Sequence, residues 1–183
     1  RAGFEAGLSV GEFQTIGTTQ GTSDYYAYLD GIYTFRNPEA VNINVFTTTG
    51  IDYSEQQDIV ALTVDMIEEE RADSIYLVTS PEGVTYNSTQ QLTGLGFTST
   101  DVFSAEDIVD LLDVADIDSN YTATYWPWIQ SRDTENSLNV WLPPTYEVVR
   151  SIALTDNVSF PWFASAGYTR GLTSALQARV KLT

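Results

Sequence analysis

The sequence predicts an α/β fold in which helices flank one mixed sheet, within a single domain over residues 1–183. Two segments have strand character: Val41–Phe46 alternates apolar and polar residues, and Ile75–Thr79 is a short apolar run. Between them, residues 54–67 carry apolar side chains at helical spacing. The order strand, helix, strand implies a βαβ unit with at least one parallel pair of strands.

The helix between these two strands has a clear start signal. Ser54 is a favoured N-cap residue and Gln57 stands three residues later, so the pair predicts a capping box. Upstream, residues 1–23 are rich in Gly, Thr and Ser and predict an irregular segment, which a short helix at Asp24–Gly31 follows. The apolar positions of the main helix form two adjacent stripes, Ile59, Leu62 and Met66 beside Val60, Val64 and Ile67.

A second helix and strand are predicted after a polar loop over residues 82–103. The helix begins at Ser104, an N-cap residue with an acidic residue, Asp107, three positions later. Tyr121–Trp126 then alternates again and predicts a strand. The residues of the helix that face the core are expected to be Ile108, Leu111 and Leu112.

The last third of the chain predicts one more strand and two more helices. A short strand ends at Trp141, before two prolines, and a helix runs from about Thr145 to Leu154. We expect the segment 169–183 to be a basic terminal helix. Its apolar face consists of Leu172, Leu176 and Val180.

The stretch Ser119–Ile129 concentrates aromatic residues around a proline. Alternation places Tyr121 and Tyr125 on one strand face, and Pro127 ends the strand because it has no backbone N–H to donate. We expect Trp128 to turn onto the core and to be buried there. This stretch is therefore predicted to be structural and not catalytic.

The composition excludes most enzyme classes, because the chain contains no cysteine and no histidine. Disulfides, Cys or His zinc sites, thiol nucleophiles and His-based triads are impossible without these residues. Asp116, Asp118 and Asn120 have calcium-loop spacing, but Tyr121 and Pro127 stand where that loop needs Gly and Glu. No carboxylate pair or nucleotide-binding loop is singled out. We therefore predict no catalytic residue, no metal, no cofactor and no hydrolase activity.

The charge is strongly negative and unevenly distributed. The net charge of −17 makes nucleic-acid binding through phosphates an unfavourable hypothesis. Residues 1–156 hold all 25 acidic residues and five of the eight basic ones, a net charge of −20, whereas residues 157–183 hold three basic residues and no acid. Three interpretations of this negative charge stay open: a solvated surface that avoids aggregation, a binding partner with a basic surface, or a source that lives in high salt. The basic end is expected to dock on an acidic surface, either of its own body or of a neighbouring copy.

No apolar run approaches the roughly 20 residues that a membrane-spanning helix needs, and no signal-peptide pattern is visible. The chain begins with Arg1 and not with Met, so we expect it to be a fragment of a longer protein.

Two ordered blocks within residues 119–171 resemble the sheath proteins of contractile phage tails. The first block is S-x-Y-x-A-x-Y-x-P-W, and the second runs from a strand into a proline turn, then T-D, a Trp, an A-G pair and R-G. This family usually has Pro before the A-G pair, where this chain has Ser165. The signature residues are Tyr121, Tyr125, Pro127, Trp128, Trp141, Asp156, Trp162, Gly167, Arg170 and Gly171.

The resemblance implies a sheath core domain with a structural role. Six subunits would form each ring around a tail tube, rings would stack helically, and contraction would drive the tube through a target envelope. The implied partners are other copies and the tail tube protein, the implied location is the virion tail after synthesis in the host cytoplasm, and no membrane partner is implied. The alternatives are an acidic carbohydrate-binding or adhesive tail domain, and an unrelated soluble α/β binding module.

Asp156 and Arg170 belong to this signature and predict an ion pair. Arg170 is expected at the N-terminus of the last helix, where the dipole disfavours a cation unless an acid compensates it. Asp156, expected just past the preceding helix, is the nearest acid in sequence. The pair would pin the loop that carries Trp162 and Phe163.

Overall fold

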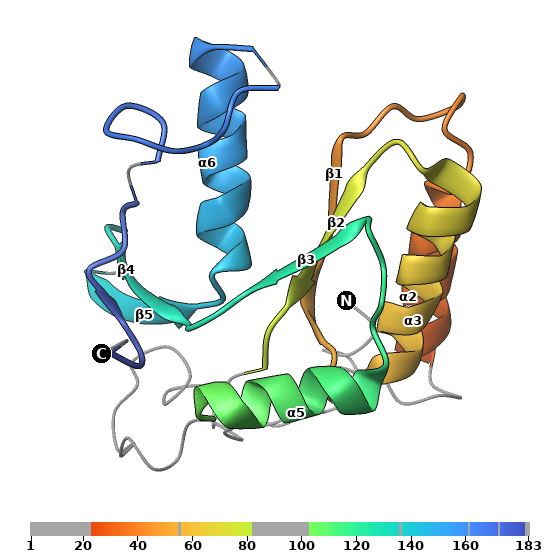
Figure 1. The fold of residues 1–183 in the computed structure, drawn as a ribbon, viewed down its shortest axis with the longest axis horizontal. Helices are drawn as coiled ribbons and strands as arrows, with labels where there is room; N and C mark the ends of the chain where they lie inside the picture. Colours follow the sequence, from red (N-terminus) through yellow and green to blue (C-terminus); the bar gives the residue numbers. More distant parts are fainter. Residues whose placement is uncertain are drawn as a thin grey trace.

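The computed structural model describes residues 23–54, 56–81, 103–135, 137–160, 162–171 and 173–181. Nearly all of the predicted loop 82–103 and of the predicted irregular segment 1–23 lies outside these residues. The α/β fold class is confirmed: helices pack beside sheets that contain both parallel and antiparallel strand pairs (Figure 1).

The first sheet is parallel and contains β1 (Val45–Asp52), β2 (Ile75–Thr79) and β3 (Thr122–Tyr125), in the order β1-β2-β3. Val45 pairs with Ile75, and Leu77 pairs with Ala123. The predicted βαβ unit is confirmed, because β1 and β2 are parallel and α3 (Gln57–Asp65) connects them. β2 ends at Thr79, the last residue of the predicted apolar run, and Ser80 and Pro81 follow it.

The second sheet is antiparallel and contains β4 (Ile129–Asp133), β5 (Leu138–Leu142) and β6 (Gln177–Ala178), in the order β5-β4-β6. The expectation of one sheet is therefore wrong. The ladder of β3 ends at Tyr125, two residues before Pro127, which has no N–H to continue it, and pairing resumes at Ile129 in a different sheet.

Helices cover the parallel sheet from both sides and from one end (Figure 1). α2 (Ser23–Thr34) and α3 lie together on one side, α6 (Thr145–Val158) stands on the other, and α5 (Ala105–Ala115) crosses below the sheet. α3 continues directly into a π-helical segment, η2 (Met66–Arg71), which ends at Ala72 in the left-handed conformation. Helix α6 extends one turn beyond its predicted end at Leu154.

The main hydrophobic core lies between α3, η2 and the parallel sheet. Both predicted stripes of the main helix face it: Ile59, Val60, Met66 and Ile67 are buried, and Leu62 and Val64 are partly buried against them. The sheet contributes buried side chains, including Ile51, Tyr76 and Val78. Tyr25 of α2 and Ile108 of α5 complete this core, and the inward position of Ile108 agrees with the sequence pattern.

One predicted capping box is wrong and the other start signal is confirmed. The Ser54 amide and hydroxyl both donate to the Asp52 carboxylate, at 2.8 and 2.7 Å, so Ser54 closes a turn and does not cap α3. At α5, the Ser104 hydroxyl accepts from the Asp107 amide and the Asp107 carboxylate accepts from the Ser104 amide. These hydrogen bonds from the Ser104 backbone and side chain lower the pKa of Asp107.

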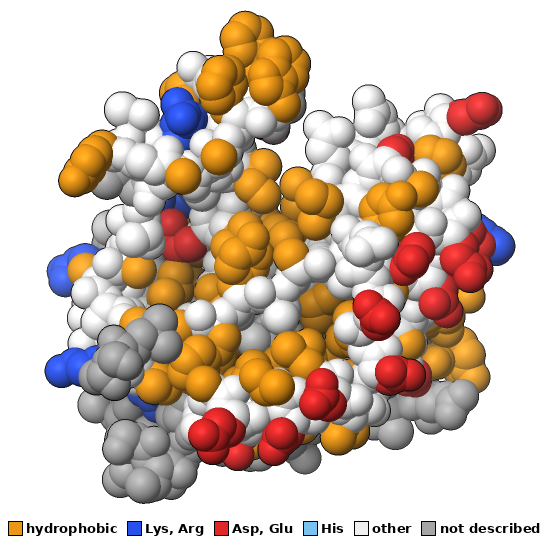
Figure 2. Space-filling view, viewed as in Figure 1, with side chains coloured by type: hydrophobic (Ala, Val, Ile, Leu, Met, Phe, Trp, Pro, Cys, Tyr) orange, Lys and Arg blue, Asp and Glu red, His pale blue; other side chains and the backbone are white. Residues whose placement is uncertain are grey.

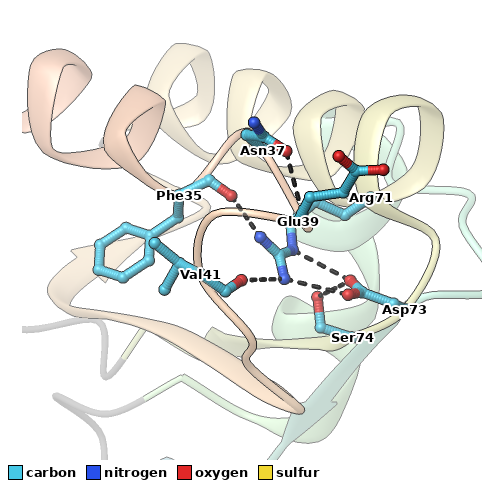
Figure 3. Close-up of polar contacts among 7 residues, drawn as sticks. All are labelled: Phe35, Asn37, Glu39, Val41, Arg71, Asp73 and Ser74. Atoms are coloured by element: carbon cyan, nitrogen blue, oxygen red, sulfur yellow. Dashed lines mark hydrogen bonds and ion pairs between the residues drawn. The ribbon is translucent and has the colours of Figure 1, made fainter.

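The predicted strand at Val41–Phe46 overlaps β1 by only two residues, Val45 and Phe46. Backbone carbonyls before Val45 accept hydrogen bonds from Arg71 and from the first residue of β2. The buried Arg71 guanidinium donates to the carbonyl oxygens of Phe35 at 2.5 Å and Val41 at 2.9 Å, and it pairs with Asp73 (Figure 3). The Asn44 carbonyl accepts from the Ile75 amide at 3.0 Å, and the ladder proper begins at Val45.

The predicted terminal helix over 169–183 is also wrong. Residues 173–181 contain no helix and include the short strand β6, while Leu172 lies outside the described residues. The Leu176 amide donates to the Gln130 carbonyl and the Arg179 amide to the Trp128 carbonyl, both at 2.7 Å. The open edge of β4 thus accepts the backbone hydrogen bonds of this segment, and strand pairing with a distant residue range overrides a weak helical pattern.

Candidate assembly surface

The connection between the two sheets, residues 126–128, holds the signature residues Pro127 and Trp128. Ser80, fully buried after β2, donates its hydroxyl to the Tyr125 carbonyl at 2.7 Å, and its own carbonyl accepts from Trp128 Nε1 at 2.8 Å. Pro127 is buried between these contacts. Both sheets are therefore tied to the end of β2 by hydrogen bonds. No sequence pattern singles out Ser80 for these bonds.

The prediction of a buried Trp128 is wrong in degree, because Trp128 is only partly buried. Trp126 packs against the main core instead, together with Tyr121, while the Tyr125 side chain is 43% exposed. The sequence pattern does not distinguish the two tryptophans, since each lies directly beside Pro127. Trp128 lies in the connection between the two sheets, which we call the joint. It donates its indole N–H to the Ser80 carbonyl there and does not fill the core.

The basic end of the chain contacts its own body at Trp141, an aromatic side chain and not the acidic surface that the charge predicts. Trp141 is buried in β5, and the Arg179 guanidinium lies over its ring at 4.6 Å from the centroid. The geometry is that of a cation–π contact. Lys181, the next basic residue, is exposed.

A buried carboxylate on α6 fixes the segment before β6. Glu147 accepts hydrogen bonds from the Ser174 hydroxyl and from Arg150, the latter at 3.1 Å. Burial alone would raise the pKa of Glu147, but the hydrogen bonds from Ser174 and the charge of Arg150 outweigh it and leave the pKa below its usual value. No sequence pattern distinguishes Glu147 from the other acidic residues, of which the chain has 25 in all.

The predicted ion pair between Asp156 and Arg170 does not form. Because α6 runs on to Val158, Asp156 lies inside its last turn with its side chain exposed. Arg170 instead donates through Nε to the Ala164 carbonyl at 3.2 Å and stacks over Phe163 at 5.4 Å. A carbonyl and an aromatic face thus take the place of the expected carboxylate.

The two glycines of the signature shape a tight turn. Gly167 has a φ of +84°, and its carbonyl accepts from the Gly171 amide at 2.9 Å. A Cβ at Gly171 would lie 3.0 Å from the Ala166 Cα, closer than backbone atoms allow without a shift. Before this turn, the Ser165 hydroxyl lies 3.0 Å from the Thr155 hydroxyl and ties the loop to α6.

Three aromatic side chains gather at the C-terminal end of α6, and we call Phe160, Trp162 and Phe163 the aromatic cluster. The Phe160 and Trp162 rings stack with centroids 4.7 Å apart and planes 4° apart, and Phe163 follows at 6.0 Å from Phe160. Trp162 is 77% exposed. Figure 2 shows hydrophobic side chains that project beyond the end of α6, with a Lys or Arg side chain beside them. Grouped exposed apolar side chains are typical of an interaction surface.

The chain is similar to a phage tail sheath protein. It is 29% identical over 156 residues to the tail sheath protein of Vibrio phage KVP40, an alignment that covers 79% of this chain and 22% of that protein. The chain thus spans about a fifth of the length of the curated relative it matches. No family model matches the sequence.

Ser80, Thr155 and Ser165 make structural hydrogen bonds. Ser80 bonds to the Tyr125 carbonyl, and Thr155 and Ser165 bond to each other. Within the described ranges, no three His, Cys, Asp or Glu side chains are grouped to hold a metal ion. No helix among the same residues is long and apolar enough to cross a bilayer.

Proposed function

We propose that this chain is a non-enzymatic, structural part of a contractile tail sheath subunit. In this proposal, subunits polymerise as stacked hexameric rings around a tail tube within the virion tail, and contraction drives the tube through a target envelope. The partners are other copies of the subunit and the tail tube protein, and the protein is made in the host cytoplasm. The observation that carries the proposal is the similarity to a tail sheath protein over 79% of the chain.

The geometry supports an assembly role in two ways. The signature residues either fix the backbone, as Pro127 and Gly171 do, or project from it, as Trp162 does. A large exposed aromatic side chain next to a rigid turn suits a contact between subunits. None of these residues is arranged for proton transfer or nucleophilic attack.

The test is electron microscopy of the purified full-length protein. Hollow, cross-striated tubes would support the proposal, and dispersed monomers at all protein and salt concentrations would overturn it. The second candidate, a carbohydrate-binding tail domain, is favoured by the exposed stack of Phe160 on Trp162, since aromatic faces pack on sugar rings. Glycan-dependent quenching of tryptophan emission in a monomeric protein would support this candidate.

A further inference from the structure

The aromatic cluster is exposed, in contrast to the tyrosines of the main core. Phe160, Trp162 and Phe163 are 56, 77 and 45% exposed, whereas Tyr53 and Tyr76 are fully buried. The cluster is ordered by ring stacking and by the contact of Phe163 with Arg170. A preformed apolar surface of this kind loses little side-chain entropy when a partner covers it.

A cation lies at the edge of the cluster. Arg170 uses Nε to bind the Ala164 carbonyl, and its two terminal nitrogens have no hydrogen-bond partner in the described part of the chain. The cluster belongs to residues 157–183, which contain no acidic residue. A partner surface that combines carboxylates with small apolar side chains would therefore complement it.

Helix α5 presents such a surface. Glu106, Asp110 and Asp113 are exposed at positions i, i+4 and i+7, and no Lys or Arg of the described residues pairs with them. Exposed valines, Val109 and Val114, lie beside them at 55 and 69% exposure. Asp110 and Asp113 lie in the later turns of α5, where the helix dipole disfavours an acid and a cation from a partner would be favourable.

The two surfaces lie at opposite ends of the molecule. α5 crosses one end of the fold, whereas the cluster projects from the other, beyond α6, and Asp and Glu side chains line the α5 end (Figures 1 and 2). One copy therefore cannot bring its own cluster onto its own α5. Contact between different surfaces of two copies is head-to-tail and generates rings or helical stacks.

We propose that the aromatic cluster and Arg170 of one copy dock on the acidic face of α5 in the next copy. The inference rests on the proposed function in one respect, that copies of this chain assemble with each other, and it names the contact. Phe160 and Trp162 cover Val109 and Val114, and Arg170 pairs with Asp110 or Asp113.

The first experiment truncates the cluster. In the full-length protein, Phe160→Ser with Trp162→Ser should raise the concentration needed for assembly by about tenfold or more, the loss typical of central aromatic contacts. The matched control is Tyr26→Ser, which removes a side chain that is 55% exposed on α2. Assembly is measured by sedimentation and electron microscopy, and thermal unfolding checks that each variant folds.

The second experiment exchanges charges. Arg170→Glu should impair assembly, and so should Asp110→Arg with Asp113→Arg. The triple variant should recover assembly, and an equimolar mixture of the two impaired proteins should recover it as well, because each copy then meets a complementary neighbour. Glu69→Arg on η2 is the control for a general change of charge.

The outcomes separate this inference from the proposed function. Wild-type tubes together with unimpaired cluster variants would overturn the inference and leave the sheath role standing. Short wild-type oligomers that depend on the cluster but never form tubes would support the contact and contradict the sheath role. Failure of both charge combinations to recover assembly would overturn the named pairing, as would a monomeric wild type whose Trp162 binds glycans.

Discussion

The two halves of this molecule are held together by different forces. In the parallel sheet with α3 and η2, residues such as Ile59, Ile67 and Tyr76 are fully buried and the core is apolar. Among the described residues from Ile129 onward, Trp141 is the buried large hydrophobic side chain, and hydrogen bonds of Glu147, Thr155 and Arg170 hold the segments in place.

This difference separates folding from assembly. An apolar core supplies most of the free energy of folding, so the first half is able to act as a scaffold. In the second half, Phe160, Trp162 and Phe163 form the exposed aromatic cluster, where they contribute little to the stability of one copy. Mutations in the first half should therefore change stability, and mutations in the cluster should change association.

The largest expected effect comes from Arg71, whose side chain is fully buried in the first half. Arg71→Ala removes the partner of Asp73 and leaves the Phe35 and Val41 carbonyls without a donor. We expect a loss of about 3–5 kcal/mol in the free energy of unfolding, measured with denaturant. The control is Arg132→Ala, at an exposed position on β4. A loss below 1 kcal/mol for Arg71→Ala would contradict the role of this guanidinium.

Alkaline pH should weaken the first half selectively. Burial raises the pKa of Tyr76 to about 12 despite its hydrogen bond with Thr48, and burial with the charge of Asp52 raises that of Tyr53 to about 12. The folded state keeps these protons above pH 10, where an unfolded tyrosine of pKa about 10 loses them. Stability is therefore complete below pH 10 and falls as the pH rises toward 12, by about 2–3 kcal/mol per tyrosine. Thr48→Val should leave this trend in place, and a midpoint of unfolding that is constant from pH 9 to 11.5 would contradict it.

The joint between the halves should show a smaller effect. Ser80→Ala leaves the Tyr125 carbonyl without its donor and should cost about 1–3 kcal/mol. Trp128→Phe removes the indole N–H and should cost about 1 kcal/mol. Thermal unfolding of each variant, with Ser137→Ala in the exposed β4–β5 turn as control, measures both effects. Equal melting temperatures for Ser80→Ala and the control would mean that the joint is not held by Ser80.

Acid should loosen the second half with the smallest effect. The pKa of Glu147 lies below its usual value, so its contribution is fully present above the unfolded pKa of about 4.3 and is lost as the pH falls through the folded pKa. We expect the protection of the Leu176 and Arg179 amides against hydrogen exchange to decrease in this pH range. The reason is that protonation of the Glu147 carboxylate weakens its hydrogen bond with Ser174. Hydrogen exchange between pH 6 and pH 3 measures this decrease. Glu147→Gln should remove the pH dependence, and persistence of it in that variant would assign the effect to another group.

Local signals predicted the first half well. Ile75–Thr79 is a strand as expected because its apolar run is buried by neighbours on both faces, and Ser104 caps α5 because its partner, Asp107, lies within the same turn. The failure at Ser54 has a local cause too, since Asp52 competes for the same hydroxyl. Such competition between nearby acceptors is not visible in a pattern of residue types.

The second half was harder to predict because its order depends on distant partners. Residues 173–181 form no helix, and Gln177 and Ala178 pair instead with the open edge of β4, which no pattern within the segment encodes. Trp162 was singled out by resemblance, but Phe160, which stacks on it, was not, since ring stacking depends on the loop that follows α6. Arg170 was matched to Asp156 by proximity in sequence, whereas the loop itself supplies its partners.

The central claim is that the first half folds the subunit and the aromatic cluster joins subunits. Electron microscopy of wild-type and Trp162→Ser full-length proteins, at matched concentration and after their melting temperatures have been compared, tests it most directly. We predict equal melting temperatures, hollow striated tubes for the wild type and dispersed particles for the variant. Tubes of equal abundance from both proteins, or a variant that melts well below the wild type, would contradict the claim.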